Sequence, residues 1–211
     1  MFFLLLLILI AIVGGWYAYN IGTKGQAELK NIDTLITQIE RNPSSYGAYD
    51  KFIDAWKSSN WVQSKDLFSG GYYDRILKIC EKNSTGVKAW QMLHEVIQKL
   101  KLAFEVDLTG KRNKAKTFRF LADSLLKEFT NELIRERIVA SIHLLSGLTQ
   151  AETQDLYNTA LKILEKHPSS QEAKVLVLDL GRLHYSVLRP NKTPTIYDEQ
   201  AIQNDIIVRA K

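Results

Sequence analysis

Three stretches of the sequence carry the same pattern, in which an amphipathic helical run, a short break and a second amphipathic run follow one another. They read QIERNPSSYGAYDKFIDAW from Gln38, ICEKNSTGVKAWQMLHEVI from Ile79 and ILEKHPSSQEAKVLVLDLG from Ile163. Apolar residues recur every three or four positions on both sides of each break, which is the period of a helix with one buried face. No alternation typical of a strand extends beyond LAFEVDL at 102–108. The pattern predicts helical hairpins and an all-α fold.

The three hairpins align with one another when they are placed on their breaks. Glu40, Glu81 and Glu165 then share one position, and the copies are offset by 41 and then 84 residues. Offsets near one and two periods of about 42 residues are typical of two-helix repeats. Each hairpin exposes an apolar stripe that it cannot cover alone, and a stacked neighbour covers it. The sequence therefore predicts a solenoid of helical hairpins over residues 29–188.

The segment between the second and third copies is helical in pattern but lacks a break of the same kind. Its apolar residues keep helical spacing from Lys114 to Leu145, and two interpretations fit: one long helix, or two helices joined near Asn131. Two capping boxes are expected beyond it, Thr149 with Glu152 and Ser169 with Glu172, because Ser or Thr followed three residues later by Glu is typical of a helix start.

The chain opens with MFFLLLLILIAIVGGWYAY, which contains no charged side chain. About 19 helical residues span roughly 28 Å, enough to cross the apolar core of a bilayer. Trp16, Tyr17 and Tyr19 follow at its end, where aromatic rings prefer the headgroup level. The sequence predicts a single transmembrane helix over residues 1–20 and a Gly-bearing linker over 21–28.

A cleavable signal peptide is the alternative interpretation of this start, with Val13, Gly14 and Gly15 as its cut site, although the basic leading segment of such signals is missing. Lys24 and Lys30 follow the span and no basic side chain precedes it, so the positive-inside tendency places the C-terminal domain in the bacterial cytoplasm. The opposite orientation places the domain outside the cytoplasm.

The hairpins resemble tetratricopeptide-type repeats, with an aromatic residue or Ala on each helix, a Pro or Ser break, and Leu180–Gly181 in the third copy. This resemblance implies a scaffold for protein–protein interaction. The tail over residues 189–211, with IYDEQAIQNDIIVRA from Ile196, resembles the tails of uncharacterised, membrane-anchored cyanobacterial proteins. It is expected to hold a short amphipathic helix that either caps the last hairpin or serves as a docking peptide.

Motifs for catalysis and metal binding are incomplete. His94–Glu95 lacks the second histidine of a zinc-protease helix, and no cofactor or metal site is expected. Asp107 follows the apolar LAFEV run and could accept a phosphoryl group, which requires a parallel sheet around it. A turn at a helix end is the favoured interpretation of Asp107, and we expect no enzyme activity.

Two groups of residues are candidate binding surfaces. The formal net charge of +5 lies after residue 20 and is too small and too dispersed to indicate nucleic acid, but one basic cluster would suit anionic lipid if it faced a membrane. A solvated turn and helix start is the alternative for that cluster. Aromatic residues around the loop at 68–74 are candidates for contact with a protein partner. The basic cluster is Lys111, Arg112, Lys114, Lys116 and Arg119, and the aromatic residues are Trp61, Tyr72 and Tyr73.

These features together predict a bacterial, membrane-anchored helical-repeat adaptor or assembly factor that holds a protein partner at the membrane. The alternatives are a periplasmic or luminal helical-repeat protein released from a signal peptide, and a phosphoryl-transfer enzyme that uses Asp107. The single cysteine, Cys80, cannot form an internal disulfide and is expected to pack as a small apolar side chain.

Overall fold

The computed structural model describes residues 2–60 and 62–211. The side chains of residues 2–13, 16–18, 20 and 21 lie outside that description. The described residues form helices joined by short turns and include no strand, which confirms the all-α prediction. The chain divides into two compact units, Met1–Leu100 and Lys101–Lys211. The sequence predicted one repeat domain over 29–188, and the boundary between the units falls inside that range.

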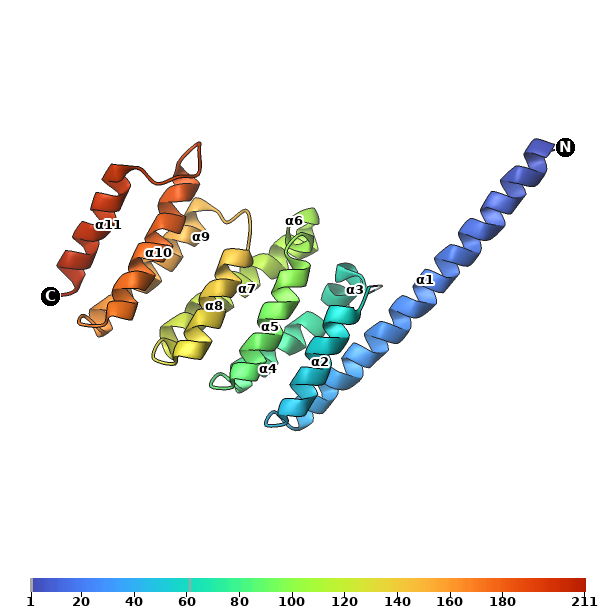
Figure 1. The fold of residues 1–211 in the computed structure, drawn as a ribbon, viewed down its shortest axis with the longest axis horizontal. Helices are drawn as coiled ribbons and strands as arrows, with labels where there is room; N and C mark the ends of the chain where they lie inside the picture. Colours follow the sequence, from blue (N-terminus) through green and yellow to red (C-terminus); the bar gives the residue numbers. More distant parts are fainter. Residues whose placement is uncertain (1, 61) are drawn as a thin grey trace. The chain divides into compact units, whose positions relative to one another are not determined.

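Unit 1 consists of two helical hairpins and one short connecting helix (Figure 1). Helices α1 and α2 form the first hairpin, α4 and α5 form the second, and α1 packs on α4 while α2 packs on α5. The turns lie at the two predicted breaks, NPSS and NSTG. The helices are α1 Phe2–Arg41, α2 Tyr46–Ser58, α3 Ser64–Ser69, α4 Tyr72–Lys82 and α5 Val87–Leu100.

Side chains at the predicted helical spacing fill the core of unit 1. Trp56 and Trp90 are almost completely buried, as expected for residues in register with the apolar stripe of their helices. Cys80 is fully buried, its Sγ lies 3.2 Å from the Ala89 carbonyl oxygen, and burial raises the pKa of its thiol. Cys80 therefore packs as a small core side chain.

Among the cations that link helices of unit 1, Arg75 and Lys99 make several hydrogen bonds each. Arg75 on α4 donates to Asp33, Thr37 and Glu40, which follow one another on the facing side of α1. Lys99 on α5 donates to the Trp56 carbonyl oxygen at 2.5 Å, at the C-terminal end of α2, where main-chain carbonyls lack helical partners. Desolvation lowers the pKa of Lys99.

Unit 2 repeats the hairpin arrangement and ends in one further helix. Helices α7 and α8 form one hairpin, α9 and α10 form the next, and α7 packs on α9. Helix α11 lies against both α9 and α10. The helices are α6 Ala103–Val106, α7 Leu108–Glu128, α8 Glu132–Leu144, α9 Gln150–Lys166, α10 Gln171–Leu188 and α11 Ile196–Arg209.

The joint between α7 and α8 confirms the two-helix interpretation of the middle segment. Asn131 is the N-cap of α8, and its Oδ1 accepts from the Ile134 amide at 3.4 Å. The capping box of Thr149 with Glu152 is confirmed at the start of α9. The Ser169–Glu172 prediction is wrong by one residue, because the Oγ of Ser170 accepts from the Ala173 amide at 3.1 Å and caps α10.

Helix α11 is fixed to the preceding hairpin by polar contacts. The Tyr157 hydroxyl on α9 donates to Asp205 Oδ2 at 2.7 Å, and Arg182 on α10 donates to Glu199 at 2.8 Å. Arg189 forms an ion pair with buried Asp198 and holds the pKa of that carboxyl well below its usual range. The tail helix therefore packs on the last hairpin, as the capping interpretation predicted.

The N-terminal helix continues through the predicted linker. Residues 21–28 belong to α1, and the Thr23 hydroxyl donates to the Tyr19 carbonyl oxygen at 3.1 Å. The glycines at 22 and 25 weaken a helix by about 1 kcal/mol each relative to Ala, but no proline is present to end it. In the part of the chain whose side chains are described, no helix combines the length and apolar character that crossing a membrane needs. The anchor predicted over residues 1–20 lies largely outside that part and stays a prediction.

Candidate functional site

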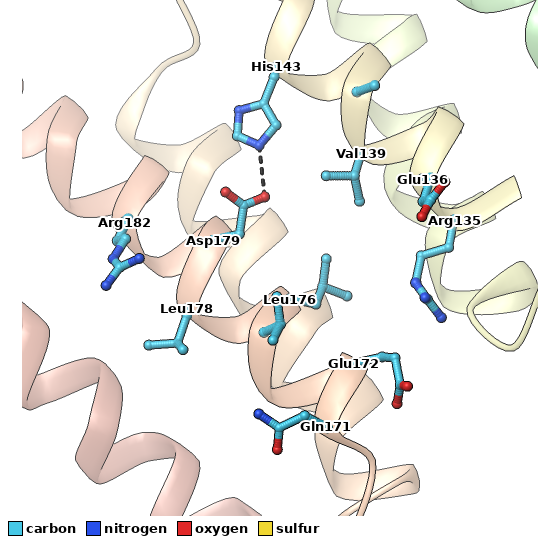
Figure 2. Close-up of a pocket in the computed structure, with 12 residues that line it drawn as sticks. Arg135, Glu136, Val139, His143, Gln171, Glu172, Leu176, Leu178, Asp179 and Arg182 are labelled. Carbon is cyan, nitrogen blue, oxygen red and sulfur yellow. Dashed lines mark hydrogen bonds and ion pairs between the residues drawn. The ribbon is translucent and has the colours of Figure 1, made fainter. Parts of the chain in front are cut away.

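A groove with a volume of about 800 Å³ opens between α8 and α10 in unit 2 (Figure 2). Its apolar lining comes from both helices and its rim carries charges of both signs. The apolar residues are Val139, Ala140, Val175, Leu176 and Leu178, and the polar residues are Arg135, Glu136, His143, Gln171, Glu172, Asp179 and Arg182.

The hairpin packing explains why this space exists. Helices α8 and α10 are the second helices of neighbouring hairpins, and those hairpins are held together chiefly through their first helices, α7 and α9. The core stripes of α8 and α10, including Ile138, Ile142 and Leu180, turn toward α7 and α9 and are buried. Apolar residues beside each stripe remain accessible in the groove, among them Val139 and Val175, and Val175 is 53% exposed.

One polar contact bridges the groove. His143 Nε2 on α8 lies 2.8 Å from Asp179 Oδ2 on α10, and Figure 2 shows the two side chains pointing toward one another. The hydrogen bond to Asp179 raises the pKa of His143 against the opposing effect of desolvation. Both side chains are about two-fifths exposed, so water screens this ion pair and its free energy is small.

Both arginines of the rim are already engaged outside the groove. Arg135 donates to the Phe129 carbonyl oxygen at 3.1 Å, and its guanidinium lies 5.3 Å from the centre of the Phe129 ring. Arg182 is held by Glu199 on α11. Glu199 neutralises Arg182, whereas Arg135 keeps its charge, because its partners are a carbonyl oxygen and a ring. The rim also carries three carboxylates, Glu136, Glu172 and Asp179, so it is acidic on balance.

A smaller pocket of about 320 Å³ extends the groove toward the loop ends of the two hairpins. It shares Arg135 and Glu172 with the larger groove and adds Phe129 and His167, whose rings lie 5.2 Å apart. The larger groove has an apolar floor between charged residues, and the smaller pocket adds mostly polar side chains at one end of it. Such a site suits an amphipathic helix or an extended segment of another protein. Within residues 2–60 and 62–211, no group of three or more His, Cys, Asp or Glu side chains is placed to hold a metal ion.

The predicted basic cluster is split by the fold. Lys111, Arg112, Lys116 and Arg119 are exposed on α7, whereas Lys114 is buried. Lys114 Nζ donates to Glu105 Oε1 at 2.8 Å and to the carbonyl oxygens of residues 146 and 147 at 3.2 and 2.9 Å. Lys114 is thus a structural cation that joins α6, α7 and the loop after α8, and it is not part of an accessible surface.

The aromatic candidates also have different environments. Tyr73 is fully buried, and its ring meets Phe68 edge-on at 5.5 Å, so its side chain belongs to the core of unit 1. Tyr72 is half-buried at the start of α4 and stays accessible. Trp61 lies outside the described residues.

Asp107 has a capping role in the structure. It is the N-cap of α7, and its Oδ1 accepts from the Gly110 amide at 2.7 Å. The parallel sheet that a phosphoryl-accepting aspartate requires is absent from the described portion of the chain. The favoured interpretation, a turn at a helix end, agrees with this geometry.

The sequence offered one weak signal for the groove. Val139 follows Ile138 and Val175 precedes Leu176, so each helix carries a large apolar residue just outside its core stripe. That such residues share one groove depends on how the hairpins pack. Comparison of the chain with protein-family models, with curated proteins and with solved structures finds no match.

Proposed function

We propose that this chain is a membrane-anchored helical-repeat adaptor that binds a helical or extended segment of a partner protein in the groove between α8 and α10. The observation that carries the proposal is the accessible apolar floor of that groove, lined by Val139 and Val175 between charged rims. Apolar side chains in a concave site are the usual source of affinity, and charges around them select the partner.

The stacked arrangement supports an adaptor role. The hairpins of unit 1 pack first helix on first and second on second, and those of unit 2 pack chiefly first helix on first. Neighbouring hairpins of repeat proteins pack side by side in this way, and such stacks offer long surfaces for binding. The resemblance to tetratricopeptide-type repeats points to the same role. The partner segment should complement the groove in shape and charge. Because acidic Glu136 and Glu172 lie on the rim, a segment with an apolar stripe and flanking Lys or Arg is the best match.

The membrane part of the proposal rests on the apolar start of the chain and on a surface of unit 2. Three large apolar side chains stand exposed within seven residues, with Leu102 at 73%, Val106 at 79% and Leu108 at 66%. The exposed cations of α7, among them Lys111 and Arg112, follow directly in the sequence. Apolar side chains beside a basic surface suit the interface of an anionic bilayer, where each cation contributes about 1 kcal/mol.

Photo-crosslinking tests the groove directly. A benzophenone amino acid placed at Val175 in the full chain should give one or a few discrete adducts in the source membranes, while the same group at exposed Lys162 on α9 should give none of them. Substituting Val139→Glu in the crosslinking chain should abolish the adducts, because a carboxylate would then lie on the apolar floor. Equal adducts at both positions would count against a specific groove.

Two measurements test the membrane proposal. The intact mass of the mature chain should equal that of the uncut sequence, and protease added to spheroplasts should leave the C-terminal domain intact. A mature chain that begins beyond Gly15, with a domain that protease reaches, would favour the released periplasmic or luminal protein.

A labelled full chain in lipid nanodiscs tests the surface at 102–108. An environment-sensitive dye on Val106→Cys should shift to an apolar spectrum with anionic lipid, and the shift should disappear when Lys111, Arg112 and Lys116 are all changed to Glu. The same dye on Lys162→Cys is the control. A spectrum that is independent of lipid charge would remove this surface from the proposal.

A further inference from the structure

We propose that the outward face of α11 binds the same face of a second copy of this chain, with the two helices antiparallel about a two-fold axis. This inference concerns a different surface from the groove and does not depend on the proposed function. Helix α11 is the last element of unit 2, and α9 and α10 cover one side of it (Figure 1).

The other side of α11 is exposed and rich in large apolar side chains. Ile196 is 73% exposed and Tyr197 77% in the first turn, and Ile207 is 61% exposed and Val208 60% in the last turn. Residues eleven positions apart lie on one face of a helix, so the first-turn pair and the last-turn pair share that face. A repeat stack that ends in solvent normally presents a polar outer face, whereas α11 exposes four large apolar side chains beside its polar ones.

Every charged residue of α11 is engaged with the preceding hairpin. Asp198 and Glu199 bind arginines of the α10 segment, Asp205 accepts from Tyr157, and Arg209 forms an ion pair with Glu165. The outward face between the two apolar pairs carries the neutral side chains of Gln200 and Asn204. Within α11, no unpaired charge on this face would therefore repel an identical face placed against it, and the exposed Lys211 lies beyond the end of the helix.

The order of residues along the face is self-complementary. In an antiparallel pair centred on position 202, Ile196 would meet Val208, Tyr197 would meet Ile207, and Gln200 would meet Asn204. The apolar residues at each end of one helix would contact the apolar residues at the opposite end of the other helix, and the central amide side chains would contact each other. A two-fold interface has this property by necessity, because residue i contacts j and j contacts i.

A cysteine experiment on the full chain tests both the contact and its direction. Two differently tagged chains, one with Gln200→Cys and one with Asn204→Cys, are mixed in detergent micelles and treated with a short bismaleimide. The mixed pair should couple severalfold faster than either chain with itself, because residues 200 and 204 lie at one level in the antiparallel pair. Identical positions are about 6 Å apart along the axis in that pair.

Two controls use cysteines outside the proposed interface, and a third variant disrupts the interface itself. Lys162→Cys, at an exposed position of α9, should couple slowly, and the parent chain should not couple, since its single Cys80 is fully buried. Ile207→Glu should reduce coupling of the mixed pair to the level of Lys162→Cys, while circular dichroism stays unchanged because Ile207 is already exposed.

Three results would overturn the proposal. Faster coupling of identical positions would indicate a parallel pair. Coupling of the mixed pair no faster than that of Lys162→Cys would indicate that lipid, detergent or another protein covers the face. Coupling that survives Ile207→Glu would indicate that the helices meet elsewhere.

Discussion

His143 Nε2 on α8 lies 2.8 Å from Asp179 Oδ2 on α10, and this contact spans the groove that we propose as the binding site. Asp179 raises the pKa of His143 above its ordinary value of about 6.5. A group whose pKa is higher in the folded state contributes stability below its unfolded pKa, and that contribution is lost as pH rises through the folded pKa. The contact is therefore present in slightly acid solution and weakens above pH 6.5.

The pH dependence of unfolding should reveal this contact. The difference in thermal midpoint between the parent chain and His143→Gln should be largest near pH 6 and should shrink as pH rises above about 6.5. Burial lowers the pKa of His184, so its effect on the pH dependence of stability has the opposite sign, but that effect is common to both chains and cancels in the difference. A difference that grows toward pH 8 would contradict the assigned contact.

Lys114 should behave unlike the other cations of its cluster. Lys114→Met should destabilise unit 2 by about 2–4 kcal/mol, because Glu105 and two carbonyl groups lose a buried charged partner. Lys111→Met, at an exposed position of the same helix, should change the free energy of unfolding by less than about 0.5 kcal/mol. Chemical denaturation of both variants measures this contrast, and equal effects would contradict the structural role of Lys114.

The hairpin turns were predictable because their signals are local. Pro43 and Pro168 each lie two residues after the end of a helix, since proline disrupts a helix interior, and the Thr149–Glu152 pair satisfies its own helix start. The joint at Asn131 was ambiguous because it has neither Pro nor Gly, and only the cap geometry distinguishes it from a continuous helix. Local signals also place a cap with a precision of about one residue, as the shift from Ser169 to Ser170 illustrates.

Burial and grooves depend on residues that are distant in the sequence. Lys114 is buried because the loop at 146–147 covers it, and Tyr73 is buried because of the packing around α4. Lys114 and Tyr73 do not differ in type from their more accessible neighbours Lys111 and Tyr72, so composition could not separate the buried residues from the accessible ones. The groove between α8 and α10 also depends on distant residues, because the two hairpins meet chiefly through α7 and α9.

Gly181 should be sensitive to the smallest substitution. A Cβ on this residue would lie 2.9 Å from Tyr157 Cε2 and 3.0 Å from Ile202, in the contact of α10 with α9 and α11. Tyr157 cannot retreat easily, because its hydroxyl is bonded to Asp205. Gly181→Ala should lower the free energy of unfolding by about 1 kcal/mol, since overpacking exceeds the gain in helix propensity.

Gly47 provides the matched control for that variant. It lies in α2, is exposed, and a Cβ there would meet no atom within 4 Å. Gly47→Ala should therefore leave stability unchanged or raise it by about 0.5 kcal/mol. Thermal unfolding of the two variants beside the parent chain should show a lower midpoint for Gly181→Ala alone, and equal midpoints in the two variants would contradict the close packing at Gly181.

Arg75 should be the most sensitive cation of unit 1. Its guanidinium is held by Asp33, Thr37 and Glu40 on α1, and it lowers the pKa of Glu40 through a hydrogen bond. Arg75→Met should destabilise unit 1 by about 1–2 kcal/mol, a value reduced by the partial exposure of these groups. Arg75→Lys should recover little of the loss, because an ammonium cannot match three acceptors at fixed positions.

The stability of the folded chain at acid pH distinguishes the ionic contacts of Arg75 from the packing of its apolar stem. Because the folded pKa of Glu40 is depressed, its contribution is present above its unfolded pKa and is lost as pH falls through the folded value. The stability gap between the parent chain and Arg75→Met should thus be full at pH 6 and should narrow below about pH 4.5. Lys78→Met, at an exposed position of the same helix, should follow the parent chain at every pH. A gap that stays constant down to pH 3 would mean that the Arg75 side chain acts through its apolar stem, and the ionic contact with α1 would contribute nothing measurable.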